Sequence, residues 1–152
     1  MTGTAFSVSV SDSRPRAVNV AFGGLVTALA AGAAEGLLRA VRGGGEFAAT
    51  ASGLLPRLAI YLVVAAVALY MVHGSRVARA LLTVGIGVVG LVSLIIEPLA
   101  VLLSTDDFGA LFAGLSPSSA VLAGCRTVHV LAVVIAIPAM YTPAAHRWFT
   151  QR

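Results

Sequence analysis

The stretch that decides the fold runs from Val77 to Leu103 and reads VARALLTVGIGVVGLVSLIIEPLAVLL. It is apolar almost from end to end, and three similar runs fill most of the remaining chain: Ala17–Leu38, Leu54–His73 and Ser118–Tyr141. Each run is about 20 residues or longer, which at ~1.5 Å rise per residue crosses a ~30 Å hydrocarbon layer as a helix. The sequence therefore predicts four transmembrane helices, over about 17–40, 54–73, 76–103 and 118–142.

The composition supports this interpretation. Apolar residues make up 59% of the 152 residues and charged residues 11%, against roughly 25% charged in ordinary globular domains. So few charges cannot cover a water-soluble surface, and the polar faces that a soluble helical bundle needs are missing. We expect an all-α integral membrane protein with a single membrane domain over residues 1–152. In this domain, 1–16 form a flexible cytoplasmic tail and 143–152 a second cytoplasmic tail.

The placement of arginine predicts the orientation, since every basic residue is Arg. One set of helix ends carries Arg14, Arg16, Arg76, Arg79, Arg147 and Arg152, and the other set carries Arg39, Arg42 and Arg57 beside several acidic residues. Cytoplasmic ends are richer in basic residues, so six against three places both termini in the cytoplasm. The expected architecture is an up-down-up-down bundle in the plasma (inner) membrane.

The first run carries small residues at a fixed spacing: Gly24, Ala28, Gly32 and Gly36. Residues four apart share one helix face, and a face of small side chains lets another backbone approach closely. We expect this face either to pack inside the bundle or to form an interface with another subunit.

Two features that could indicate a bound ligand do not fit their usual context. The segment Gly85–Gly90 spells GxGxxG, but it lies inside an apolar membrane run rather than between a strand and a helix, so we reject dinucleotide binding. A single cysteine, Cys125, excludes a Cys-based metal site. No nucleophile–base arrangement, P-loop or zinc spacing is present, and the arginines lie at helix ends rather than in a cluster. We therefore expect no enzymatic activity, no cofactor, no metal and no nucleic-acid partner.

Several ionisable residues lie inside the runs, where each costs ~3 kcal/mol at mid-bilayer unless it is paired. They are Glu35, Arg39, Arg57, Glu97, Arg126 and His129. Counting from the expected helix ends places all of them in the outer half of the membrane. We expect Glu97 to pair with Arg126 across the third and fourth helices, and Glu35 with Arg39 as an i,i+4 pair. Arg57 and His129 are expected as polar neighbours.

These charges have three interpretations. In the first, they form a buried ion pair that fixes the register of the helices. In the second, Glu97 and His129 form a proton or substrate site. In the third, the charges pair with a different subunit. Pro98 follows Glu97 directly, and it is expected to kink the third helix and free a carbonyl that Arg126 can use.

Two short motifs resemble small actinobacterial four-helix membrane proteins of unassigned function. They are GSRVARALL at Gly74–Leu82, which opens the third helix, and PAAHRWF at Pro143–Phe149, where a Pro-Ala break precedes an aromatic pair. The size and four-crossing layout are also similar to accessory subunits of large mycobacterial envelope machines, among them the mammalian cell entry (Mce) lipid-import complex. This resemblance implies a role beside larger subunits and transfers no site.

The sequence leaves three functions to compare. The first is a non-catalytic accessory or stabilising subunit of a larger envelope complex, such as a lipid transporter, with membrane lipids and other integral membrane subunits as partners. The second is a small homodimeric proton-coupled transporter that uses an intramembrane carboxylate. The third, a membrane oxidoreductase or haem protein, is disfavoured because only His129 lies well inside a run.

Overall fold

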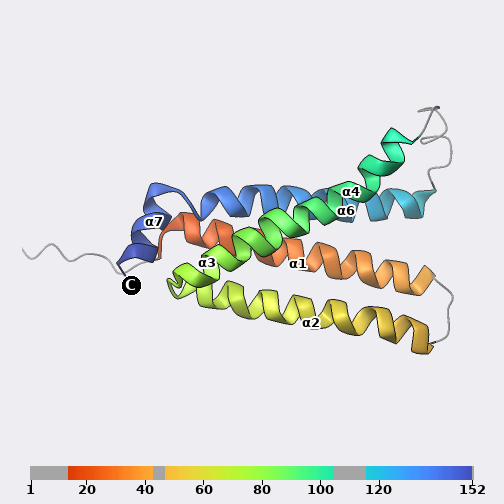
Figure 1. Cartoon of the computed structure of the whole chain (residues 1–152), viewed down its shortest axis with the longest axis horizontal. Coiled ribbons are helices and arrows are strands. Elements are labelled where there is room, and N and C mark those ends of the chain that lie inside the picture. Colours follow the sequence, from red (N-terminus) through yellow and green to blue (C-terminus); the bar gives the residue numbers. More distant parts are fainter. Residues whose placement is uncertain (1–13, 43–46, 105–115, 152) are drawn as a thin grey trace, which may run out of the picture.

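The computed structural model describes residues 14–42, 47–104 and 116–151 of the chain, and every regular element in these ranges is a helix (Figure 1). The elements are α1 (Arg16–Arg42), α2 (Phe47–Val72), α3 (Arg76–Leu82), the π-helix η1 (Thr83–Gly90), α4 (Leu91–Leu103), α6 (Pro117–Ala139) and α7 (Pro143–Thr150). Four spans are long and apolar enough to cross a membrane: Arg16–Arg42, Leu55–Val72, Arg76–Ala100 and Pro117–Ala139. The prediction of an all-helical protein with four candidate membrane spans is confirmed.

Two element bounds differ from those expected. Helix α2 begins at Phe47 rather than near residue 54. The prediction differed because a count of apolar residues finds only the part of a helix that lipid can cover, and it omits a helical start that contains Ala and Thr. The tail expected from residue 143 is instead the helix α7. Thr142 caps this helix by accepting a hydrogen bond from the backbone N–H of Ala145, and Pro143 occupies the first turn, where its missing N–H costs nothing.

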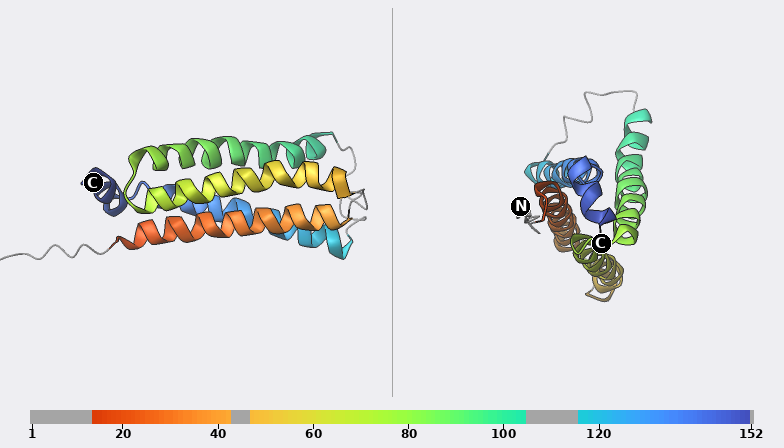
Figure 2. Two further views of the ribbon diagram at one scale, coloured as in Figure 1. Left: turned by 90° about the horizontal axis from the view of Figure 1, so that it is seen from below. Right: turned by 90° about the vertical axis from the view of Figure 1, so that its left-hand side faces the viewer.

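Helix α1 is the centre of the packing. It lies along α6 over most of its length and against α2 on another side, whereas α2 and α4 do not pack against each other over any length. Towards the end opposite α7, the third span (α3, η1 and α4) leans away from the other helices, which Figure 1 and the right-hand view of Figure 2 make visible. The assembly is therefore closed at one end and open at the other.

The closed end, which we call the α7 end, carries the larger hydrophobic core. Fully buried side chains from five elements meet there, including Leu25, Met71, Leu82, Met140 and Phe149. Arg76 ties α7 to the third span: its Nε and Nη2 atoms donate to the carbonyl oxygens of Phe149 and Thr150, at 2.7 and 2.8 Å. These carbonyls end α7 and have no partner further along that helix, so Arg76 satisfies them as a C-terminal cap.

The third span is not a continuous α-helix. In η1 the backbone N–H of Leu91 reaches the carbonyl of Ile86, five residues back, which is the π-helical spacing. The GxGxxG glycines lie in this segment. A methyl group on Gly87 would come within 3.1 Å of the Ile137 side chain, so this glycine permits α6 to approach closely. Gly87 thus serves helix packing, whereas a methyl group on Gly85 would have nothing within 4 Å.

Candidate functional site

The most unusual side chain in the described part of the chain is Glu35, a carboxylate with 8% of its surface exposed inside a membrane span. Its Oε1 atom accepts a hydrogen bond from Arg39 Nη2 at 2.7 Å, and Arg126 Nε lies 3.7 Å from the same oxygen. The i,i+4 pair with Arg39 that the sequence predicted is present. A carboxylate buried at this depth needs such partners, because transfer out of water is costly unless the charge is paired.

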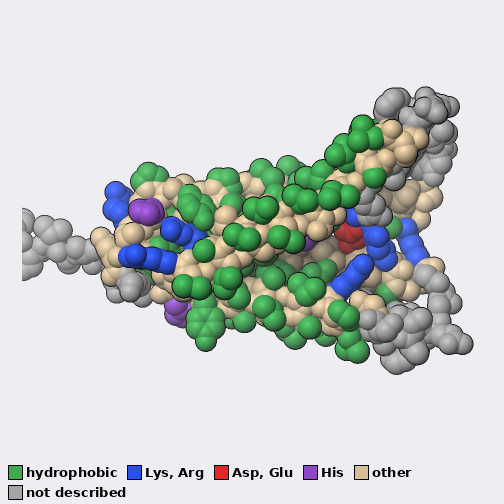
Figure 3. All heavy atoms as spheres, in the orientation of Figure 1, with side chains coloured by type: hydrophobic (Ala, Val, Ile, Leu, Met, Phe, Trp, Pro, Cys, Tyr) green, Lys and Arg blue, Asp and Glu red, His purple; other side chains and the backbone are tan. Residues whose placement is uncertain are grey.

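Arg57 from α2 reaches the same place. A methyl group on Gly36 would lie 3.6 Å from Arg57 Nη1, so this guanidinium rests on α1 beside Glu35. Arginines from α1, α2 and α6 therefore surround one carboxylate. Figure 3 shows these basic side chains gathered around the acidic group at the end opposite α7. We call the residues Glu35, Arg39, Arg57 and Arg126 the Glu35 cluster.

Tyr61 and His129 lie about one helical turn from the Glu35 cluster towards the α7 end, over Gly32. A methyl group on Gly32 would come within 3.1 Å of both the Tyr61 hydroxyl oxygen and His129 Nδ1. That Nδ1 atom is buried and has no hydrogen-bond partner among the described residues. Glu35 acts electrostatically on both side chains. Sequence reasoning placed His129 here but missed Tyr61. Tyr61 could have been found from its spacing, because it lies one helical turn from Arg57 and both residues therefore share one face of α2.

The small-residue face of α1 packs inside the chain. A methyl group on Gly24 would lie 2.9 Å from Ala136 Cβ and 3.0 Å from the Ala132 carbonyl oxygen. Ala28 is buried, and Gly32 and Gly36 face His129 and Arg57 as described. The face of Gly24, Ala28, Gly32 and Gly36 is thus covered by α6 and α2, and the alternative of a subunit interface on this particular face is not supported.

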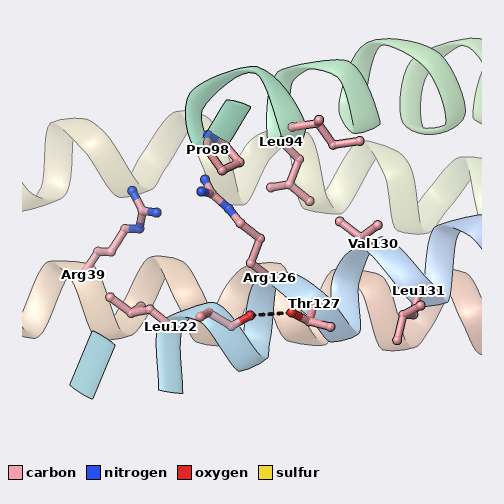
Figure 4. A pocket seen from close by; sticks show the side chains of 10 residues that line it. Arg39, Leu94, Pro98, Leu122, Arg126, Thr127, Val130 and Leu131 are labelled. Atoms are coloured by element: carbon pink, nitrogen blue, oxygen red, sulfur yellow. Dashed lines mark hydrogen bonds between the residues drawn. The ribbon is translucent and has the colours of Figure 1, made fainter. Parts of the chain in front are cut away.

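The side chain of Glu97 lies outside the described part of the structure, so its pairing with Arg126 stays a prediction. What is described is that Arg126 points from α6 towards Pro98 on α4, across a cavity of about 470 Å³ (Figure 4). Arg39 and Leu94 line the same cavity, and the dashed line in Figure 4 marks the Thr127 hydroxyl donating to the Ala123 carbonyl at 2.9 Å. Among the described residues, Arg126 has an ion-pair contact with Glu35 on α1.

A second cavity, of about 440 Å³, lies between α1, α2 and the third span. Its walls are mostly aliphatic, and Tyr61 and His129 are their polar members. This volume lies within the range of about 300–1,000 Å³ that is usual for ligand pockets. Leu94 borders both cavities, so they lie on either side of the same point of α4.

Within the described ranges no group of three or more His, Cys, Asp or Glu side chains is placed to hold a metal ion. His73 Nδ1 donates to the Leu69 carbonyl oxygen, 2.7 Å away, at the α7 end. It is thus at the opposite end of the molecule from His129, so these two histidines do not form a shared ligand pair. What the site offers chemically is positive charge, hydrogen-bonding groups and an adjoining apolar cavity.

No protein-family model, curated protein or solved structure matches this chain.

Proposed function

We propose that this chain is a non-catalytic integral membrane subunit that docks on a larger envelope complex in the plasma membrane. In this proposal the four spans form an up-down-up-down bundle with both termini in the cytoplasm. The Glu35 cluster then lies in the outer half of the bilayer, and α7 lies at the cytoplasmic face, where Arg76, Arg79 and Arg147 follow the positive-inside rule.

The observation that carries the proposal is the outward face of α1. Its exposed positions Gly23, Thr27, Ala30 and Ala34 are spaced by four, three and four residues and so share one side of the helix. The Thr27 hydroxyl donates to the Gly23 carbonyl at 2.9 Å, which leaves a smooth surface with no unsatisfied donor. Small residues on an exposed face permit the close approach of another transmembrane helix.

A contrast with α2 strengthens this argument. The exposed side of α2 presents large aliphatic side chains, with Leu58 54%, Leu62 63% and Leu69 52% exposed. Bulky apolar side chains of this kind suit a surface that acyl chains cover. Helix α1 differs because its central exposed stripe is made of small residues, which offer lipid little contact and offer a partner helix a groove.

Affinity purification of the full chain in a mild detergent tests the proposal. We expect the wild-type protein to recover other integral membrane proteins in stoichiometric amounts. Ala30→Leu should lower this recovery by about tenfold, because overpacking a close helix contact costs about 1–3 kcal/mol. Ala66→Leu, the same change on the exposed side of α2, is the matched control and should leave recovery unchanged. A wild-type chain that purifies alone, or equal recovery by the two variants, would contradict the proposal.

The second candidate, a small homodimeric proton-coupled transporter, is favoured by one observation: a carboxylate, Glu35, is buried inside a span. Two guanidinium groups already contact this carboxylate, whereas a site that exchanges a proton for a substrate needs a carboxylate free to bind both. We therefore rank it below the accessory role. Cells that express the chain and extrude a cationic dye, with loss of extrusion in Glu35→Gln, would reverse this ranking.

A further inference from the structure

On both α1 and α2, the residues change in character in the same sense between the Glu35 cluster and the 440 Å³ cavity, whose own lining includes Tyr61 and His129 but none of the arginines of the cluster. On α2 the sequence Arg57, Tyr61, Val64 runs from the Glu35 cluster into the cavity, each residue about one turn from the last. On α1, which approaches from the opposite direction, Arg39, Gly32 and Leu29 make the same change. From the Glu35 cluster towards the α7 end, each helix thus carries first an arginine, then a residue at the level of the Tyr61 hydroxyl and the His129 ring, and then an aliphatic side chain.

Glycines make this continuity possible. A methyl group at Gly32 would press on the Tyr61 hydroxyl and on the His129 ring, both at 3.1 Å, and would displace them. Gly36 leaves Arg57 room to lie against α1. The space between the arginines and the aliphatic cavity is therefore bordered by backbone and by two hydrogen-bonding side chains, rather than filled by α1 side chains.

The charge at the outer end is positive. Among the described side chains of the cluster, three guanidinium groups face one carboxylate, and that carboxylate is hydrogen-bonded to Arg39. Arg57 forms no ion pair with any described residue, and the Arg39 side chain keeps 41% of its surface exposed. Even when Arg126 is counted as fully neutralised, the described side chains of the Glu35 cluster keep an excess cation. Guanidinium groups bind phosphate oxygens in a bidentate manner, so this end suits an anionic phosphate.

We propose that the chain binds an anionic phospholipid at this place. One acyl chain lies in the cavity between α1, α2 and the third span, and the headgroup phosphate lies at Arg57 and Arg39. Tyr61 and His129, at the boundary of charge and hydrocarbon, donate hydrogen bonds to the ester oxygens. The orphaned His129 Nδ1 is one group that such a ligand would satisfy. The inference depends on the membrane location of the chain and is independent of the accessory role.

The test measures lipid retained by the purified full chain, by native mass spectrometry from detergent that contains phosphatidylglycerol or phosphatidylcholine with matched acyl chains. We expect a preference of about tenfold or more for phosphatidylglycerol. Arg57→Gln should remove most of this preference. Arg42→Gln is the matched control, because it removes the same charge from an exposed position at the end of α1, outside the cluster, and should leave the preference unchanged.

A second substitution separates the cavity from the charge. Val64→Trp fills the aliphatic part of the cavity, so it should lower the retention of both lipids while it leaves their ratio near the wild-type value. If Arg57→Gln does not yield folded protein, Arg57→Lys keeps the charge without the bidentate fork and should reduce the preference partially.

Three results would overturn the proposal: equal retention of the two lipids by the wild type, equal effects of Arg57→Gln and Arg42→Gln, or full retention by a folded Val64→Trp variant. Displacement of the lipid by millimolar inorganic phosphate would also overturn it, because it would show an anion site that does not use the acyl chain. Since all of these measurements use the isolated chain, their failure is distinct from a failure to recover a partner.

Discussion

The two ends of the molecule are held together by different forces. At the α7 end, side chains from five elements close a hydrophobic core, and Arg76 and Arg79 seal it from outside: Arg76 donates to the α7 carbonyls, and Arg79 lies over the Tyr141 and Phe149 rings at 4.8 and 4.9 Å. At the Glu35 end, the third span lies apart from the other helices, and the Glu35 cluster lies where the α7 end has its hydrophobic core. The α7 end is specified by packing and the Glu35 end by charge pairing, which leaves the Glu35 end able to accept a ligand between its helices.

The largest effect should come from removing the charge at the centre of the Glu35 end. Glu35→Gln keeps the side-chain shape but leaves Arg39 and Arg126 without their shared anion inside a span. Removing one partner of a buried ion pair costs on the order of 3 kcal/mol. We expect the midpoint of unfolding by sodium dodecyl sulfate, added to protein in mild detergent, to fall accordingly.

Arg42→Gln is the control for this measurement, since Arg42 is exposed at the end of α1. If the Glu35→Gln and Arg42→Gln variants unfold at the same detergent fraction as the wild type, charge pairing does not hold this end together.

A smaller loss is expected from Gly24→Ala, which tests the close packing that leads into the α7 end. The added methyl group would meet Ala136 Cβ at 2.9 Å and the Ala132 carbonyl at 3.0 Å, so α1 and α6 must separate. Overpacking of this kind costs about 1–3 kcal/mol. The thermal midpoint of the purified chain should fall.

The neighbouring residue offers a matched control. A methyl group at Gly23 has nothing within 4 Å, so Gly23→Ala should stabilise the helix by up to about 1 kcal/mol through alanine's higher helix propensity. Thermal midpoints that move in the same direction for the two variants would show that α1 and α6 are not in close contact at this point.

The smallest effect is expected for Arg76→Ala, and it should be local. This change removes two hydrogen bonds to the carbonyls of Phe149 and Thr150, a loss of about 1 kcal/mol at a partly exposed site. Hydrogen–deuterium exchange should accelerate over 143–150 while the spans keep their protection. Arg147→Ala, at an exposed position on α7 itself, should not change the exchange rates. Uniform acceleration across the chain would mean that the loss of these hydrogen bonds destabilises the whole fold and not α7 alone.

Much of the fold follows from the sequence because run length and composition decide whether a helix can cross a membrane. The Glu35–Arg39 contact was predictable for a similar reason, since residues four apart on one helix are neighbours whatever surrounds them. Helix α7 was missed because a helix of 8 residues has no long apolar run. Its Thr-Pro start was the available signal.

The contacts between helices were harder to predict. Counting from helix ends gives the level of Arg126 along its helix, but that level does not give the direction in which a side chain points around the helix. Two carboxylates, Glu35 and Glu97, were therefore expected at a level from which Arg126 could be reached. The described contact is with Glu35, across the α1–α6 interface. Tyr61 shows the same difficulty, because its place beside His129 depends on how α2 is rotated against α1.

The π-helical segment also governs which residues of α4 reach these cavities. A π turn holds more residues than an α turn, so η1 shifts the angular phase of everything after it, relative to a regular helix starting at Arg76. One residue corresponds to about 100° of rotation about the axis. Leu94 and Pro98, which border the cavities, both follow this offset. The π-helical segment thereby sets the angular alignment of α4 with respect to α3, without altering where the third span begins or ends.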